Sequence, residues 1–214
     1  MRTWLTSRTG SIALTTLIAI GVGLALLSAI AAQGVSARTI AASLLVLCFI
    51  VFTFGGVLYA GRAFLNWQID EASSHLIWER GFVIGGVLAT VLGLALLEDL
   101  LRTAGEPVLS RLGMVTYLVG AVVVIAAETA YLGKRDWLYP QIVLYVVLAF
   151  LAQAAFGASL LQTGLVAEWA GWATVLWNIA WLFYMLIIRP RDIYFPVLHH
   201  VAPLIIGIAL LTQP

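Results

Sequence analysis

TIAASLLVLCFIVFTFGGVLYAG, residues 39–61, is a stretch of 23 residues without one charged side chain. About 20 apolar residues in a helix are enough to cross the hydrocarbon core of a bilayer. In water such a helix would expose apolar side chains on every face, whereas lipid accommodates them. The stretch therefore predicts a transmembrane helix.

The composition extends this prediction to the whole chain. Of the 214 residues, 63% are hydrophobic and 10% are charged, and the mean hydropathy is +1.05. A soluble domain has about 25% charged residues, so a soluble fold would not bury this much apolar surface. Seven helices of about 20 residues would occupy about 140 positions. Only short loops remain, and we expect one transmembrane helical domain over residues 1–214.

Apolar runs give the expected positions of the helices and define an all-α, polytopic transmembrane bundle of about seven spans. The first run is about twice as long as the apolar core of a signal peptide, so we expect it to be retained as a span. The expected spans are residues 11–32, 39–61, 81–97, 112–132, 139–161, 169–188 and 193–211.

The basic residues predict the orientation of the chain, because cytoplasmic loops carry an excess of Lys and Arg. With seven spans, the side that holds the N-terminus carries eight of them and the opposite side carries three. We therefore expect a cytoplasmic N-terminus and an external C-terminus. The eight are Arg2, Arg8, Arg62, Arg80, Lys134, Arg135, Arg189 and Arg191, and the three are Arg38, Arg102 and Arg111.

A small set of polar side chains inside the spans forms the candidate proton or ligand site. An ionisable residue at a helix centre costs about 2.5–3.5 kcal/mol, so it suggests a function. Glu128 lies near the cytoplasmic end of the fourth span, and His199 and His200 enter the seventh span from the same side. Asn178 and Gln153 lie near mid-membrane, where they either join helices by hydrogen bonds or line a substrate path.

The two histidines are adjacent, and adjacent helical residues point about 100° apart. We expect one imidazole to face the bundle, near Glu128 and either Asn178 or Gln153, and the other to reach the lipid interface. Pro203 lacks an N–H group, which would leave a carbonyl one turn earlier unpaired, so a kink is expected there. A hydrogen-bonded packing role for the pair remains the simpler alternative to a proton relay.

The segment between the second and third spans carries a second candidate site. Glu71, His75 and Glu79 are spaced i, i+4, i+8 and share one face of a helix. This face is either solvated or a carboxylate–histidine–carboxylate site for zinc or iron. The only cysteine, Cys48, excludes a multi-cysteine metal site.

Two resemblances extend the interpretation. The span number and the few histidines at one membrane face resemble the seven-helix hydrolases related to alkaline ceramidases and progestin-type receptors, which implies zinc. Residue 71 is Glu here, where that pattern has Ser four residues before the histidine. The C-terminal third, with PRDIYFP at 190–196 and HHVAP at 199–203, resembles small uncharacterised bacterial multi-spanning proteins. This resemblance implies a bacterial inner-membrane location.

These observations leave three functional hypotheses. The first is a small transport, sensing or assembly protein with a polar cluster at its cytoplasmic side. The second is a metal-dependent hydrolase acting on a lipid at the cytoplasmic leaflet, and the third is a proton-coupled carrier that uses Glu128 and a histidine. The expected partners are the lipid bilayer and other membrane proteins or a second copy. A net charge of +1 does not favour nucleic acid.

The odd number of spans makes a direct prediction about the two ends of the chain. Reporter fusions after Met1 and after Pro214 should report opposite membrane faces, with Met1 in the cytoplasm. Both reporters on one face would contradict the seven-span topology and would separate Glu128 from the histidines.

Overall fold

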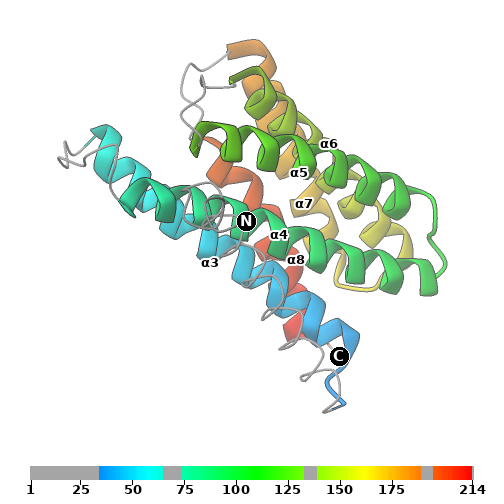
Figure 1. Ribbon diagram of the computed structural model, residues 1–214. Coiled ribbons are helices and arrows are strands. Elements are labelled where there is room, and N and C mark those ends of the chain that lie inside the picture. Colours follow the sequence, from blue (N-terminus) through cyan, green and yellow to red (C-terminus); the bar gives the residue numbers. More distant parts are fainter. Residues whose placement is uncertain (1–33, 65–73, 133–138, 189–194, 214) are drawn as a thin grey trace, which may run out of the picture.

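The computed structural model describes residues 34–64, 74–132, 139–188 and 195–213. Every regular element in these ranges is helical, which confirms the all-α class for the described part of the chain (Figure 1). The elements are α3 (Ala37–Phe64), α4 (Ser74–Thr103), α5 (Leu109–Leu132), α6 (Tyr139–Thr163), α7 (Glu168–Ile188), the 3-10 helix η1 (Phe195–His200) and α8 (Val201–Thr212).

Five of these helices, α3 to α7, are long and apolar enough to cross a membrane. The bounds of α3, α5, α6 and α7 lie within a few residues of the expected spans. Helix α4 is longer at both ends than the expected run 81–97, because the charged residues that flank the run are also helical. The expected first span, residues 11–32, lies outside the described residues. The described part thus has the architecture of an integral membrane protein.

The last segment differs from the expectation of one helix with a kink at Pro203. It consists of the 3-10 helix η1 and the α-helix α8, which meet between His200 and Val201. Pro203 therefore lies in the first turn of α8, where the lack of an N–H group is tolerated. The 12 residues of α8 alone rise only about 18 Å. With η1, the segment rises about 30 Å, close to the thickness of the hydrocarbon core.

The helices alternate in direction and pack in two neighbouring groups. Helix α3 lies against α4 and α8, α6 lies against α5 and α7, and α4 contacts α5 (Figure 1). The face that holds the start of α3, the α4–α5 and α6–α7 connections and the end of α8 is called the Arg38 face here. The opposite face, with the start of α4 and the end of α5, is called the Glu79 face.

Hydrogen bonds at the Arg38 face hold the C-terminal end of the chain in place. The Arg38 guanidinium donates to the carbonyl oxygens of Leu210, at 3.1 Å, and Gln213, at 2.9 Å. The side-chain oxygen of Gln213 accepts the backbone N–H of Ala167. The end of α8 is thereby joined to α3 and to the α6–α7 connection.

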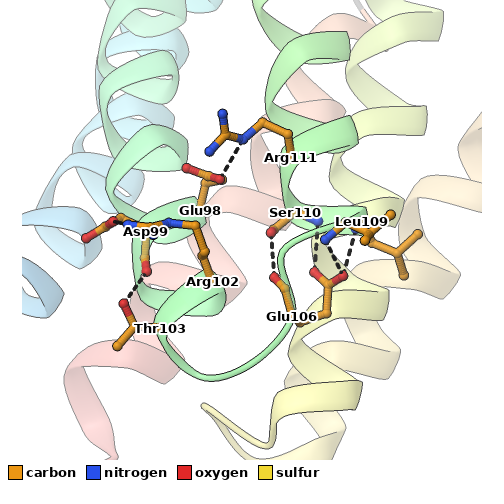
Figure 2. A network of polar contacts seen from close by, with 9 residues as sticks. Glu98, Asp99, Arg102, Thr103, Glu106, Leu109, Ser110 and Arg111 are labelled. Atoms are coloured by element: carbon orange, nitrogen blue, oxygen red, sulfur yellow. Dashed lines mark hydrogen bonds and ion pairs between the residues drawn. The ribbon is translucent and has the colours of Figure 1, made fainter.

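Helix α4 ends in a Schellman motif, and Gly105 supplies the left-handed residue with φ +100°. The N–H of Gly105 donates to the carbonyl of Arg102, and the N–H of Glu106 donates to that of Leu101. An ion pair of 2.8 Å between Glu98 and Arg111 joins α4 to α5 beside this turn (Figure 2).

The Glu106 carboxylate caps the first turn of α5 (Figure 2). It accepts the backbone N–H groups of Val108, Leu109 and Ser110 at 2.7–2.9 Å. Burial acts against ionisation of this group, but these donors and the Ser159 hydroxyl outweigh it and lower the pKa of Glu106. A negative charge here also complements the positive end of the helix dipole.

Close contact between α3 and α8 depends on a glycine. A Cβ atom added at Gly207 would lie 2.8 Å from the carbonyl oxygen of Ala42, which cannot move without shifting the backbone. We therefore expect Gly207→Ala to lower the free energy of unfolding by about 1–3 kcal/mol. Gly81 in α4 has open space around its Cβ position, so Gly81→Ala should raise it by about 0.5–1 kcal/mol. Thermal unfolding in detergent measures both, and a change of the same sign in the two variants would contradict this packing.

The cap at Glu106 predicts a dependence of stability on pH. A carboxylate with a lowered pKa in the folded state stabilises the fold above its unfolded pKa, and this stabilisation is lost as the pH falls through the folded pKa, below 4.5. Glu106→Gln should cost about 0.3–1 kcal/mol at pH 7. The difference in unfolding temperature between wild type and variant should shrink on acidification below pH 4.5. A constant difference from pH 7 to pH 3 would show that the carboxylate charge does not contribute.

Candidate functional site

Both histidines lie inside the bundle, so the expectation that one reaches the lipid interface is wrong. His199 and His200 are each 0% exposed, and their ring centroids are 4.1 Å apart. The Phe52 ring of α3 lies 4.1 Å from the His200 ring, and the Phe150 ring of α6 lies 6.2 Å from the His199 ring. Since η1 packs against α3, α6 and α8, both imidazoles meet protein and not lipid.

A chain of hydrogen bonds connects the middle of α5 to η1. The hydroxyls of Tyr117 and Tyr145 are 3.2 Å apart, and the Tyr145 hydroxyl is 2.7 Å from Nε2 of His199. All three side chains are buried. A hydroxyl and a neutral imidazole each donate and accept, so this chain can hold its protons in more than one arrangement.

His200 contacts the opposite side of the bundle. Its Nδ1 lies 3.4 Å from the Thr90 hydroxyl of α4, and that hydroxyl lies 2.8 Å from the Gly86 carbonyl oxygen and donates to it. Because the hydroxyl proton is used in this way, Nδ1 of His200 is the donor to Thr90. The Nε2 atom of His200 has no hydrogen-bond partner among the described residues.

A buried ion-pair network, the Arg80 network, lies nearer the Glu79 face. The Arg80 guanidinium is 2.9 Å from the Glu79 carboxylate and 3.1 Å from that of Glu128, and it stacks 4.8 Å from the centre of the Tyr131 ring. Glu79, Arg80 and Glu128 are 0%, 2% and 4% exposed. The network joins α4 to α5.

Glu128 and the histidines occupy different levels of the bundle. A Cβ atom at Gly120 would contact the Tyr145 ring, and Glu128 follows Gly120 by eight residues on α5. It thus lies about 12 Å closer to the Glu79 face than the level of Tyr145. Glu128 therefore pairs with Arg80 and not directly with an imidazole.

The two expected amides are also buried. Gln153 in α6 and Asn178 in α7 are both 0% exposed. The amide nitrogen of Asn178 donates to the carbonyl of Thr174 at 2.7 Å, within its own helix. No hydrogen bond between α6 and α7 through these amides is present among the described residues.

The structure describes only part of the expected metal site at Glu71, His75 and Glu79. Glu71 lies outside the described residues, as does the side chain of His75. Glu79 is buried and paired with Arg80, so the alternative of a solvated helix face does not hold for Glu79. In the part of the chain that is described, no group of three or more His, Cys, Asp or Glu side chains could hold a metal ion. A zinc or iron site at Glu71, His75 and Glu79 stays a prediction.

Four residues of these networks carry no signal that singles them out in the sequence. Thr90, Tyr117 and Tyr145 lie in apolar runs, where they look like ordinary packing residues. Arg80 lies at the edge of such a run, and sequence alone assigns it to a loop. A lone Glu128 within a span nevertheless requires a cation nearby, and Arg80 is the basic residue next to the third run.

Comparison with known protein families, with curated proteins and with solved structures gives no match to this chain.

Proposed function

We propose that this chain is a seven-span protein of the bacterial inner membrane that moves protons, alone or together with a solute. The observation that carries the proposal is the buried hydrogen bond of 2.7 Å between Tyr145 and His199. It lies where the last membrane segment changes from 3-10 to α-helix. A 3-10 stretch within a helix often marks a functional site.

The orientation follows from the basic residues and from residues 11–32 as a further span. The Glu79 face then lies in the cytoplasm, and the Arg38 face lies outside. The resemblance of the C-terminal third to small bacterial multi-spanning proteins supports the inner membrane. The bilayer surrounds the apolar outer surfaces of α5 and α7.

The Arg80 network is the cytoplasmic entry point of this proposed path. Glu128 is 4% exposed, so its ionised form is costly in this apolar environment, and a bound proton removes that cost. Glu128 is therefore the group that takes up a proton from the cytoplasmic side.

The hydrogen-bonded chain then carries the proton to the middle of the bundle. For this path, water has to bridge the interval of about 12 Å along α5 between Glu128 and the level of Tyr145. The Tyr145 hydroxyl takes a proton from this water as it gives its own to Nε2 of His199, and Nδ1 of that imidazole then releases one. The ring of His200 stacks on that of His199, and its Nε2 is the next acceptor.

Proton flux into liposomes tests this function. Purified protein is reconstituted with a pH-sensitive dye inside, and a potassium diffusion potential drives proton entry. Wild type should acidify the lumen, and Tyr145→Phe and Glu128→Gln should each reduce the rate about 100-fold, the usual contribution of one proton-transfer group. Tyr184→Phe is the matched control, because it removes a hydroxyl from α7 about 10 Å along the helix from Trp177, the residue that contacts η1.

Equal unfolding temperatures of wild type and variants would show that the effects are not caused by misfolding. A flux that survives both Glu128→Gln and Tyr145→Phe unchanged would refute the proposed path. Flux that no variant affects but that exceeds empty liposomes would indicate a different route through the protein.

A further inference from the structure

Two carboxamides inside the bundle have most of their hydrogen-bonding atoms unpaired. Both polar atoms of the Gln153 amide, and the amide oxygen of Asn178, have no hydrogen-bond partner among the described residues. Each residue is 0% exposed. Buried polar atoms in native proteins are nearly always paired, so three unpaired atoms on neighbouring helices require an explanation.

The packing of α6 on α7 brings the two amides to one level. A Cβ atom at Gly157 would lie 3.0 Å from the side chain of Thr174, so these residues face each other in the antiparallel pair. Gln153 precedes Gly157 by four residues, and Asn178 follows Thr174 by four. One turn toward the Glu79 face therefore places Gln153 opposite Asn178.

This level is also the level of η1. The indole N–H of Trp177, next to Asn178, donates to the carbonyl of Leu198 at 2.7 Å. The Phe150 ring, three residues before Gln153, lies 6.2 Å from the His199 ring. A molecule bound between the two amides would therefore lie close to the imidazole of the proposed proton path.

We infer that Gln153 and Asn178 bind a small uncharged molecule with an amide group, such as urea or a primary amide. A carboxamide presents a carbonyl acceptor beside an N–H donor, which matches the acceptor and donors of a second amide. Helix α6 has no charged residue, and the only one in α7 is Glu168, at its Arg38-face end. An ion at this level would find no charged side chain on either of these two helices, which favours a neutral ligand. The inferred binding site does not depend on proton transport. A coupling between the bound molecule and His199, in contrast, rests on the proposed function.

Urea and guanidinium form a matched pair of probes, because they have the same planar shape and differ in charge. Their uptake into liposomes containing the full chain is followed by stopped-flow light scattering, with empty liposomes as the baseline. Wild type should take up urea faster than empty liposomes and should not take up guanidinium chloride. Gln153→Leu should reduce the protein-dependent urea uptake at least about tenfold through the loss of its hydrogen bonds. Gln162→Leu, at an exposed position of the same helix, should leave it unchanged.

The unfolding temperature separates ligand binding from a structural role. Because Gln153→Leu replaces unpaired polar atoms by an apolar side chain, its unfolding temperature should equal or exceed that of wild type. A lower unfolding temperature would show that the amide is needed for the fold and would overturn the inference. Urea uptake equal to that of empty liposomes, uptake unaffected by Gln153→Leu, or guanidinium uptake as fast as that of urea would each overturn it as well. Proton flux without urea uptake would contradict the amide site but not the proposed function. Urea uptake without proton flux would contradict the proposed function but not the amide site.

Discussion

The last membrane segment has to bring two histidines into an apolar bundle, where their polar atoms need partners from other helices, and the other polar contacts are arranged around this requirement. Tyr145 of α6 reaches His199, and Thr90 of α4 reaches His200. Partners thus come from both groups of helices, with η1 between them. In lipid, a polar group without a partner inside the protein costs several kcal/mol, so these contacts also define which helices can be neighbours.

Charged side chains and neutral polar side chains lie at different levels of the bundle. The Arg80 network lies near one end of α4 and α5, whereas tyrosines, imidazoles and amides occupy the middle. A charged side chain costs about 2.5–3.5 kcal/mol at the centre of a span and less near its ends. Neutral hydrogen-bonding groups contribute only about 0.6 kcal/mol per interhelical bond. The arrangement therefore keeps the charged groups toward one end of these helices, and leaves the middle to neutral hydrogen-bonding groups.

The sequence predicts the long helices well, because a bilayer requires a length and an apolar composition that can be read from residues alone. It also places Glu128, Gln153 and Asn178 within spans, and one of the two histidines in the bundle. The pairing of Glu128 with Arg80 cannot be read in this way, since it depends on how α4 packs on α5. The hydrogen bonds of Tyr117 and Tyr145 cannot be predicted from sequence either. In the sequence these tyrosines look like packing residues, and only the packing of other helices shows their hydrogen-bond partners.

The error about the two imidazoles has a specific physical cause. The expectation that one of them faces lipid assumes a segment at the edge of the bundle, where neighbouring residues alternate between protein and lipid. Instead, His199 and His200 of η1 are buried, as are Ala202, Pro203, Ile206 and Gly207 of α8. In this central part of the segment both rings are surrounded by protein whatever their angular separation, whereas Ile208 and Leu211 further along α8 are exposed. The glycine contact of α8 with α3 holds the segment in this central position, and the environment of the histidines is therefore a consequence of helix packing and not of their spacing in the sequence.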